Sequence, residues 1–253
     1  MRSDRDAGAA LRVAVVTPYH REEDHLLAAA HASVAAQTHP CTHILVADGH
    51  PSPAAAGLAA QHIVLPVSHG DYGDTPRAVG SFSALAQGFD AITYLDADNW
   101  YAVDHVESMI ALSQRTAASV CVAARSLHRL DGSLLDAHGE PSDGTTHVDT
   151  NCLFLTSAAF RVLPLWALVP RALHPIDDRI VWAAILALGL RVARWNAPTV
   201  HYRTAFRIHY EERGEAPPPG AKGHEHVRAA MAWWKGLSPH DREVVFQRLG
   251  VRF

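Results

Sequence analysis

Short apolar runs that recur between helix-like segments constrain the fold of this sequence more than any other feature. Five runs have the length and composition of strands that are buried on both faces, at residues 12–17, 44–47, 63–67, 91–95 and 120–124. Segments with helical spacing alternate with them, at residues 22–36, 54–60, 76–87 and 103–114. This alternation predicts an α/β fold with a mainly parallel central sheet flanked by helices.

The second half of the sequence is less regular. Residues 127–146 mix Gly, Asp, Ser and Pro, and we expect an excursion or a hairpin there. The remaining segments are assigned by their patterns: strands at 147–155, 192–195 and 199–202, and helices at 157–162, 179–188, 224–234 and 239–249. Residues 211–223 contain a run of three prolines and are expected to form a loop. We predict one domain over residues 11–210, a proline-rich loop over 211–223, and a helical extension over 224–253.

Composition excludes several classes of protein. The 253 residues include 22 Lys and Arg against 26 Asp and Glu, for a net charge of −4, and no basic stripe suited to nucleic acid is present. Three widely spaced cysteines indicate neither a disulfide framework nor a cysteine zinc site. No signal-peptide pattern opens the sequence, and no apolar run approaches the roughly 20 residues needed to cross a bilayer. We expect a cytoplasmic protein, and the abundance of Ala, Arg and His suggests a bacterial one.

Acidic residues follow several of the predicted strands. The segment from Tyr94 to Trp100 reads YLDADNW, so an apolar strand places Asp96 and Asp98 at its carboxyl end, where open α/β sheets bind ligands. Oxygen ligands of this kind suit Mg²⁺ or Mn²⁺, which can bridge nucleotide phosphates. Taken alone, the motif is equally typical of a solvated turn. Asp48 also ends a buried strand, and Thr17–Tyr19 end another, which favours a nucleotide-binding cleft at one sheet edge.

Four motifs in order resemble the opening of family-2 glycosyltransferases with the GT-A fold. Residues 13–49 supply a strand that ends in Pro, a helix that closes with SVAAQT, and a strand that ends in Asp-Gly, although His50 replaces the usual Ser. The segment PRAVG at residues 76–80 stands where the family reads Ala-Arg-Asn-x-Gly, and LDADN matches its LDADD. The resemblance implies that residues 11–100 form a nucleotide-sugar-binding half and residues 101–210 an acceptor-binding half.

The resemblance also implies roles for individual residues. Those expected to contact the nucleotide sugar are Thr17, Pro18, Tyr19, Asp48, Arg77 and Asp96. Those expected to hold Mn²⁺ or Mg²⁺ are Asp96, Asp98 and His201. Near the acceptor the resemblance places Asp149, Thr150 and Asn151. The loop acids Asp71 and Asp74 are alternatives for contacts to the sugar, or are simply solvated.

An inverting transfer needs a base for the acceptor hydroxyl, because a hydroxyl group is a poor nucleophile. The family's base is the second acid of a pair that opens a helix, and Asp177-Asp178 occupies the matching place. The resemblance therefore implies Asp178 as the base, with Asp177 as the fallback; alternatively, both acids only stabilise the helix N-terminus.

The function implied is an inverting, metal-dependent glycosyltransferase that moves a sugar from a nucleoside diphosphate sugar, with UDP expected, to an unidentified hydroxyl acceptor. One alternative is a nucleotidyltransferase acting on a sugar phosphate, although no Gly-rich basic loop follows the first strand. The other is a non-catalytic nucleotide-sugar-binding protein, which would not need the acids. The C-terminal helices could cover the acceptor or form a homodimer contact. Trp233 and Trp234 could contact a sugar or a partner, or pack against the core.

Overall fold

The computed structural model describes residues 10–137 and 147–252, and every structural statement below concerns these residues. A single mixed sheet forms its centre, with strand order β3-β2-β1-β4-β8-β6-β9-β5 and β7 beside β6. The strands are β1 (Val13–Tyr19), β2 (Cys41–Ala47), β3 (Gln61–Val64), β4 (Ala91–Tyr94), β5 (Trp100–Tyr101), β6 (Val120–His128), β7 (Leu134–Asp136), β8 (Leu153–Thr156) and β9 (Val192–Arg203). The first four are parallel to one another, and β8 reverses direction between β4 and β6. The predicted α/β class with a mainly parallel sheet is confirmed.

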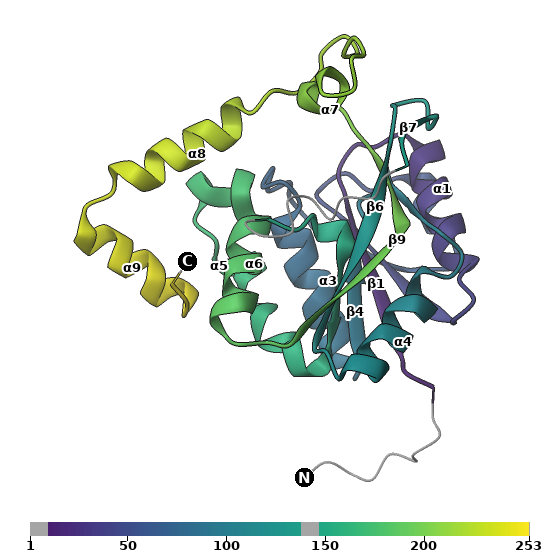
Figure 1. Cartoon of the computed structure of the whole chain (residues 1–253). Helices are drawn as coiled ribbons and strands as arrows, with labels where there is room; N and C mark the ends of the chain where they lie inside the picture. Colours follow the sequence, from purple (N-terminus) through teal and green to yellow (C-terminus); the bar gives the residue numbers. More distant parts are fainter. Residues whose placement is uncertain (1–9, 138–146, 253) are drawn as a thin grey trace, which may run out of the picture.

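Helices cover both faces of the sheet (Figure 1). The α-helices are α1 (Asp24–Ala35), α2 (Pro53–Ala56), α3 (Asp74–Ala86), α4 (His105–Thr116), α5 (Leu165–Leu168), α6 (Asp177–Ala187), α7 (Arg207–Glu211), α8 (Glu225–Gly236) and α9 (Pro239–Leu249). Short 3-10 helices are η1 (Thr150–Cys152), η2 (Ser157–Val162) and η3 (Arg171–Ile176). One face of the sheet packs against α1 and α4, and the other against α3, with α5 and α6 behind it.

The contact between α3 and the sheet is unusually close. A Cβ atom at Gly80 would lie 2.5 Å from Val16 Cγ1 and 3.1 Å from Val46 Cγ2, so only glycine permits this approach of helix to strands. Arg77 lies one helical turn earlier on α3, beside the ends of the same strands. The fit at Gly80 therefore sets the distance of Arg77 from the sheet edge.

The C-terminal helices join the main core. Ala230 of α8 and Val245 and Leu249 of α9 belong to the hydrophobic cluster that contains the strands of the sheet. The two helices form an arm along one side of the molecule (Figure 1). Ser238 caps α9 as its sequence predicts, because its hydroxyl accepts a hydrogen bond from the Asp241 amide.

Differences from the sequence predictions lie mostly in the second half. The strand expected over 147–155 is only Leu153–Thr156, because the Asp149 side chain accepts the Asn151 amide and turns the chain into η1. The two strands expected at 192–195 and 199–202 are one strand, β9, with irregular pairing to β6 between them. The hairpin expected over 127–146 is present as β6 and β7, and residues 138–146 lie outside the described residues.

Candidate active site

Side chains from the carboxyl ends of the strands surround a pocket of about 450 Å³. Among the residues that line it, eight have carboxyl side chains: Glu22, Asp48, Asp71, Asp96, Asp98, Asp149, Asp177 and Asp178. Only Arg77 and Lys222 supply permanent positive charge to the same lining. Pro18 and Tyr19, from the end of β1, also line it. The pocket is therefore strongly acidic, and a diphosphate could enter it only with additional positive charge.

Asp48 holds the loop that follows β3. Its carboxylate accepts hydrogen bonds from the main-chain N–H groups of His69 and Gly70, at 2.9 and 3.1 Å, and is 2.8 Å from His69 Nδ1. Burial raises the pKa of Asp48, but these hydrogen bonds outweigh burial and lower it below its ordinary value. Gly49 allows the turn, with φ of +73° and Ser68 N only 2.3 Å from the place of a Cβ atom. Asp48 is thus an ionised anchor for residues 68–70.

Arg77 lies at the floor of the pocket among three carboxyl groups. Its Nη2 donates to Asp96 Oδ1 at 2.6 Å, and its Nη1 lies 3.7 Å from Asp177 and 4.0 Å from Asp74. Burial lowers the pKa of this guanidinium, but the adjacent carboxylates more than compensate, so it stays charged. Because Arg77 is nearly fully buried, most of its charge is neutralised by these acids rather than presented to a ligand.

Asp74 and Asp177 form a buried acid pair next to Arg77. Asp74 is fully buried, and neither of its carboxyl oxygens accepts a hydrogen bond from any described residue. Burial, followed by the neighbouring Asp177 carboxylate, raises the pKa of Asp74 far above its ordinary value. Asp74 is therefore a neutral acid at pH 7. Asp177 is the ionised partner that Arg77 contacts.

Asn151 fixes Asp96 in place. The Asn151 amide donates to Asp96 Oδ2 at 2.8 Å and to Asp149 Oδ1 at 2.7 Å, while its Oδ1 accepts the Asp96 main-chain N–H at 2.6 Å. The Asn151 side chain is 1% exposed and does not line the pocket. The structure thus places Asn151 under the aspartate motif, as a support, and not among the residues that face the pocket.

Asp98 lines the pocket with no cationic side chain bound to its carboxylate among the described residues. Burial, with Asp96 and Glu22 nearby, raises the pKa of Asp98 to about 7. A divalent cation would relieve this unfavourable burial of negative charge, so the site fits Mg²⁺ or Mn²⁺. In the part of the chain that is described, however, no three His, Cys, Asp or Glu side chains are arranged to hold a metal ion by themselves.

His201 and Thr17 lie away from this pocket. His201 Nδ1 is 2.8 Å from Ser126 Oγ, its ring stacks on Trp100 with 5.2 Å between centroids, and burial lowers its pKa to about 4. Thr17 is fully buried, with its hydroxyl 2.8 Å from His43 Nε2. Neither side chain lines the pocket. The structure therefore does not bring His201 to Asp96 and Asp98, nor Thr17 to the ligand space.

Asp178 is the second residue of α6 and lines the same pocket. Its Oδ1 accepts the Arg179 amide at 2.7 Å, and its Oδ2 lies 2.7 Å from His147 Nε2. Burial lowers the pKa of His147, but the hydrogen bond and charge of Asp178 raise it above its ordinary value overall. Asp178 is therefore held in one orientation by a histidine that the sequence analysis did not select. The two residues are 31 positions apart in the sequence, and no local pattern indicated this pairing.

Asp149 and Thr150 line the same pocket. Asp149 is bound by Arg125, whose Nη1 is 2.5 Å from Asp149 Oδ2 and whose guanidinium lies over the Tyr202 ring at 4.5 Å. Residues missed by sequence reasoning also line the pocket: His20, Glu22, Tyr72, Tyr202, Phe206 and Lys222. Lys222 ends the proline-rich loop. Its main chain pairs with residues 205–207, which holds this loop end at the pocket rim.

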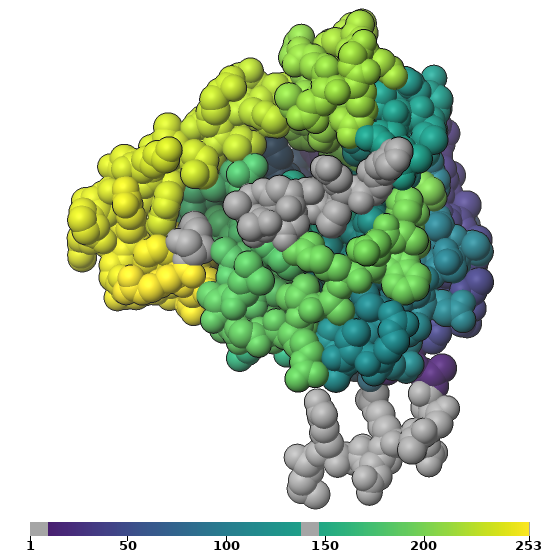
Figure 2. All heavy atoms as spheres, viewed as in Figure 1, coloured from purple at the N-terminus to yellow at the C-terminus, as the bar shows by residue number. Residues whose placement is uncertain are grey.

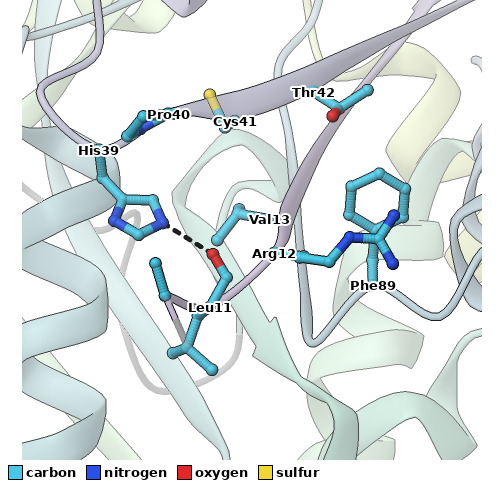
Figure 3. Close-up of a pocket in the computed structure, with 9 residues that line it drawn as sticks. Leu11, Arg12, Val13, His39, Pro40, Cys41, Thr42 and Phe89 are labelled. Atoms are coloured by element: carbon cyan, nitrogen blue, oxygen red, sulfur yellow. Dashed lines mark hydrogen bonds between the residues drawn. The ribbon is translucent and has the colours of Figure 1, made fainter. Parts of the chain in front are cut away.

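A second hollow of about 270 Å³ lies at the opposite edge of the sheet, where β1 and β2 begin (Figure 3). His39 Nε2 is 2.8 Å from the Leu11 carbonyl there, and Arg12 lies over the Phe89 ring at 4.6 Å. No carboxyl side chain is among its lining residues in the described chain. Because the acidic side chains lie at the carboxyl edge of the sheet and not in this hollow, the acidic pocket remains the candidate active site.

Comparison with known proteins identifies the class. The sequence model of glycosyl transferase family 2 matches residues 14–141, which include Asp48, Arg77, Asp96 and Asp98. The chain belongs to glycosyl transferase family 2, and it is a glycosyltransferase with the GT-A fold. No curated protein matches the sequence.

Solved structures share the fold at low sequence identity. S. aureus TarS (residues 1–349) in complex with UDP has a TM-score of 0.59 and 12% identity, over 94% of this chain and 71% of that one. TarS (residues 1–349) in complex with UDP-GlcNAc has a TM-score of 0.60 and 12% identity, over 94% of this chain and 72% of that one. The mannosyltransferase PcManGT from Pyrobaculum calidifontis, in complex with GDP-Man and Mn²⁺, has a TM-score of 0.59 and 14% identity, over 96% of this chain and 70% of that one. No described helix combines the length and apolarity that would let it span a membrane.

Proposed function

We propose that this glycosyltransferase moves a sugar from a nucleoside diphosphate sugar, with UDP as the nucleotide, to a hydroxyl acceptor with inversion of the anomeric centre. The observation that supports this most directly is that one pocket is lined by both Asp98 and Asp178. The first suits a divalent cation and the second suits a base. TarS with UDP and PcManGT with GDP-Man and Mn²⁺ share the fold, which supports a nucleotide-sugar donor.

In this proposal the donor lies along the ends of the first four strands. Pro18, Tyr19 and Asp48 border the space for the nucleoside, and Asp96 and Asp98 border the space for the diphosphate. Mn²⁺ or Mg²⁺ would be held by Asp98, with Asp96 beside it, and would neutralise charge on the leaving diphosphate. Lys222 at the rim is the exposed cation available to the phosphates. Arg77 acts mainly by holding Asp96 in position.

Asp178 is the proposed base. Its carboxylate takes the proton of the acceptor hydroxyl, the hydroxyl oxygen forms a bond to the anomeric carbon, and the bond from that carbon to the diphosphate breaks with its electron pair leaving on the diphosphate. His147 orients Asp178 through the 2.7 Å contact. Asp149 and Thr150 border the acceptor side of the same pocket.

A thermal-shift screen of UDP, UDP-sugars and GDP-sugars, with Mn²⁺ and with EDTA, tests the donor and the metal together. We expect UDP-linked donors to raise the melting temperature only when the cation is present. A rise of equal size in EDTA would contradict the metal assignment, and a preference for GDP-sugars would contradict UDP. Incubation with a nucleoside triphosphate and a sugar phosphate should release no pyrophosphate; its release would instead identify a nucleotidyltransferase.

A further inference from the structure

A groove of about 440 Å³ adjoins the candidate active site and differs from it in the charge and type of the side chains that line it. Three separate parts of the chain form it: the loop at Gly70 and Tyr72, η3 with Arg171 and His174, and α8 with His226 and Trp233. Gly70 and Tyr72 line both this groove and the acidic pocket, so the two spaces adjoin at this loop. Figure 2 shows the surface hollowed between α8, which lines the groove, and the segment that includes α7, whose flanking residues Phe206 and Lys222 line the acidic pocket.

Two exposed aromatic side chains border the groove. The Tyr72 side chain is 55% exposed and that of Trp233 is 38% exposed. Tyr72 has φ of +61°, a left-handed conformation that non-glycine residues rarely adopt. The buried Arg77 holds it there, since its Nη1 donates to the Tyr72 carbonyl at 2.8 Å. The fold thus presents a tyrosine ring at the junction of the two spaces.

The charge of the groove is opposite to that of the acidic pocket. Arg171, His174 and His226 line it, and no carboxyl side chain is among its described lining residues. Asp74 is 3.8 Å from His174 Nε2, but Asp74 is fully buried beneath the groove. Arg171 has no carboxylate partner among the ion pairs of the described residues, and it is exposed. An anion in this groove would therefore meet the positive charge of Arg171, with no carboxyl side chain among the described residues that line the groove.

We propose that this groove is the acceptor subsite and that it binds a saccharide bearing an acidic group. A sugar ring presents a flat apolar face that stacks on Trp233 and Tyr72, and Arg171 pairs with the acidic group in a forked arrangement. The groove has the size typical of small-ligand sites, and it adjoins the acidic pocket at Tyr72, the side on which a hydroxyl of the same ligand would extend toward Asp178. The acceptor role rests on the proposed function, whereas saccharide binding does not.

Saturation-transfer NMR on the full chain, with UDP and Mn²⁺ present, tests this inference. The probes are methyl β-D-glucuronide, glucose 6-phosphate and methyl β-D-glucoside. We expect the acidic saccharides to bind at least ~10-fold more tightly than the neutral glucoside, and the comparison of the first two distinguishes a carboxylate from a phosphate ligand. Arg171→Gln should abolish the difference between acidic and neutral probes, and Trp233→Ala should weaken all three.

Arg228→Gln is the matched control, because Arg228 is an exposed arginine on α8 that does not line the groove. It should leave all probes unchanged, and UDP affinity should be unchanged in all three variants. Equal binding of acidic and neutral probes, or acidic-probe binding unaffected by Arg171→Gln, would overturn the inference. If UDP binds and no saccharide does, the subsite fails while the proposed function stands. If the wild type does not bind UDP, the proposed function and the acceptor role fail together.

Discussion

The acidic pocket and the adjoining groove differ in how the chain builds them. Residues at the ends of parallel strands line the pocket, so the sheet topology alone brings Asp48 and Asp98 together. The groove instead depends on α8 packing against η3, and neither element belongs to the sheet. The pocket is acidic with a buried floor, whereas the groove is aromatic and basic with an exposed lining. The sheet thus determines the position of the acidic pocket, and the packing of α8 determines that of the groove.

The largest effect should follow from Asp178→Asn in the pocket. Removing the proposed base should slow transfer by about 10²–10⁴-fold while UDP affinity stays the same, because the proposed role of Asp178 is on the acceptor. Release of UDP from the donor, measured with an acidic saccharide as acceptor, gives the rate, and calorimetry gives the affinity. Asp104→Asn, which removes an exposed carboxylate outside the pocket, is the control. Retained turnover in Asp178→Asn would refute the assignment of the base.

Two arginines give the sharpest contrast in stability. Arg77→Met removes a buried cation shared by three acids, and we expect a loss of about 3–5 kcal/mol in the free energy of unfolding. Arg171→Met removes an exposed cation and should change it by no more than about 0.5 kcal/mol. Urea denaturation measures both. Equal losses in the free energy of unfolding would contradict the difference between a buried arginine in the pocket and an exposed one in the groove.

Asp98→Asn should weaken ligand binding in the acidic pocket without changing ligand binding in the groove. With the carboxylate lost, Mn²⁺-dependent binding of UDP should weaken by about 100-fold, while binding of methyl β-D-glucuronide in the groove stays the same. Calorimetry with UDP in Mn²⁺ and in EDTA measures the first effect. If UDP affinity in Mn²⁺ were undiminished, Asp98 would not be a metal ligand.

The smallest effect concerns pH and the buried acid Asp74. Because its pKa is raised in the folded state, folding retains a proton that the unfolded chain releases above about pH 4. Asp74 therefore lowers stability progressively as pH rises from about 4 toward 8. Asp74→Asn keeps the shape of the side chain but removes the titrating carboxyl group. It should therefore raise the free energy of unfolding at pH 8 by about 1 kcal/mol or more and flatten the pH dependence of that free energy. Thermal melts at pH 5 and pH 8 test this, and an unchanged slope would contradict a neutral Asp74.

The meeting of Asp48, Asp96 and Asp98 at one edge of the sheet could be predicted from the sequence for a physical reason. Strands buried on both faces are continuous apolar runs, and the residues that follow them must meet at one edge of a parallel sheet. Asp48, Asp96 and Asp98 could therefore be placed together from spacing alone. The helix that opens at Asp178 is also a local feature, marked by an acidic pair before an apolar segment.

The rest depends on contacts between distant residues. The amide of Asn151 reaches Asp96 from 55 residues away, and His147 reaches Asp178 from a segment with no regular structure. Lys222 lies in a loop whose prolines predicted no regular structure, yet its main chain pairs with residues 205–207. No local pattern encodes these pairings, because each side chain is selected by a partner that folding brings near.

The hydrogen bonds of Asp48 have a kinetic consequence. The carboxylate is already occupied by the main-chain N–H groups of His69 and Gly70. A nucleobase that binds Asp48 must first displace this loop, so donor binding would include an opening step. The observed rate of association should then level off as donor concentration rises, and the apparent affinity should be reduced by the small fraction of open molecules. Stopped-flow measurements with UDP would show this saturation, and substitution of His69 by alanine should raise the plateau.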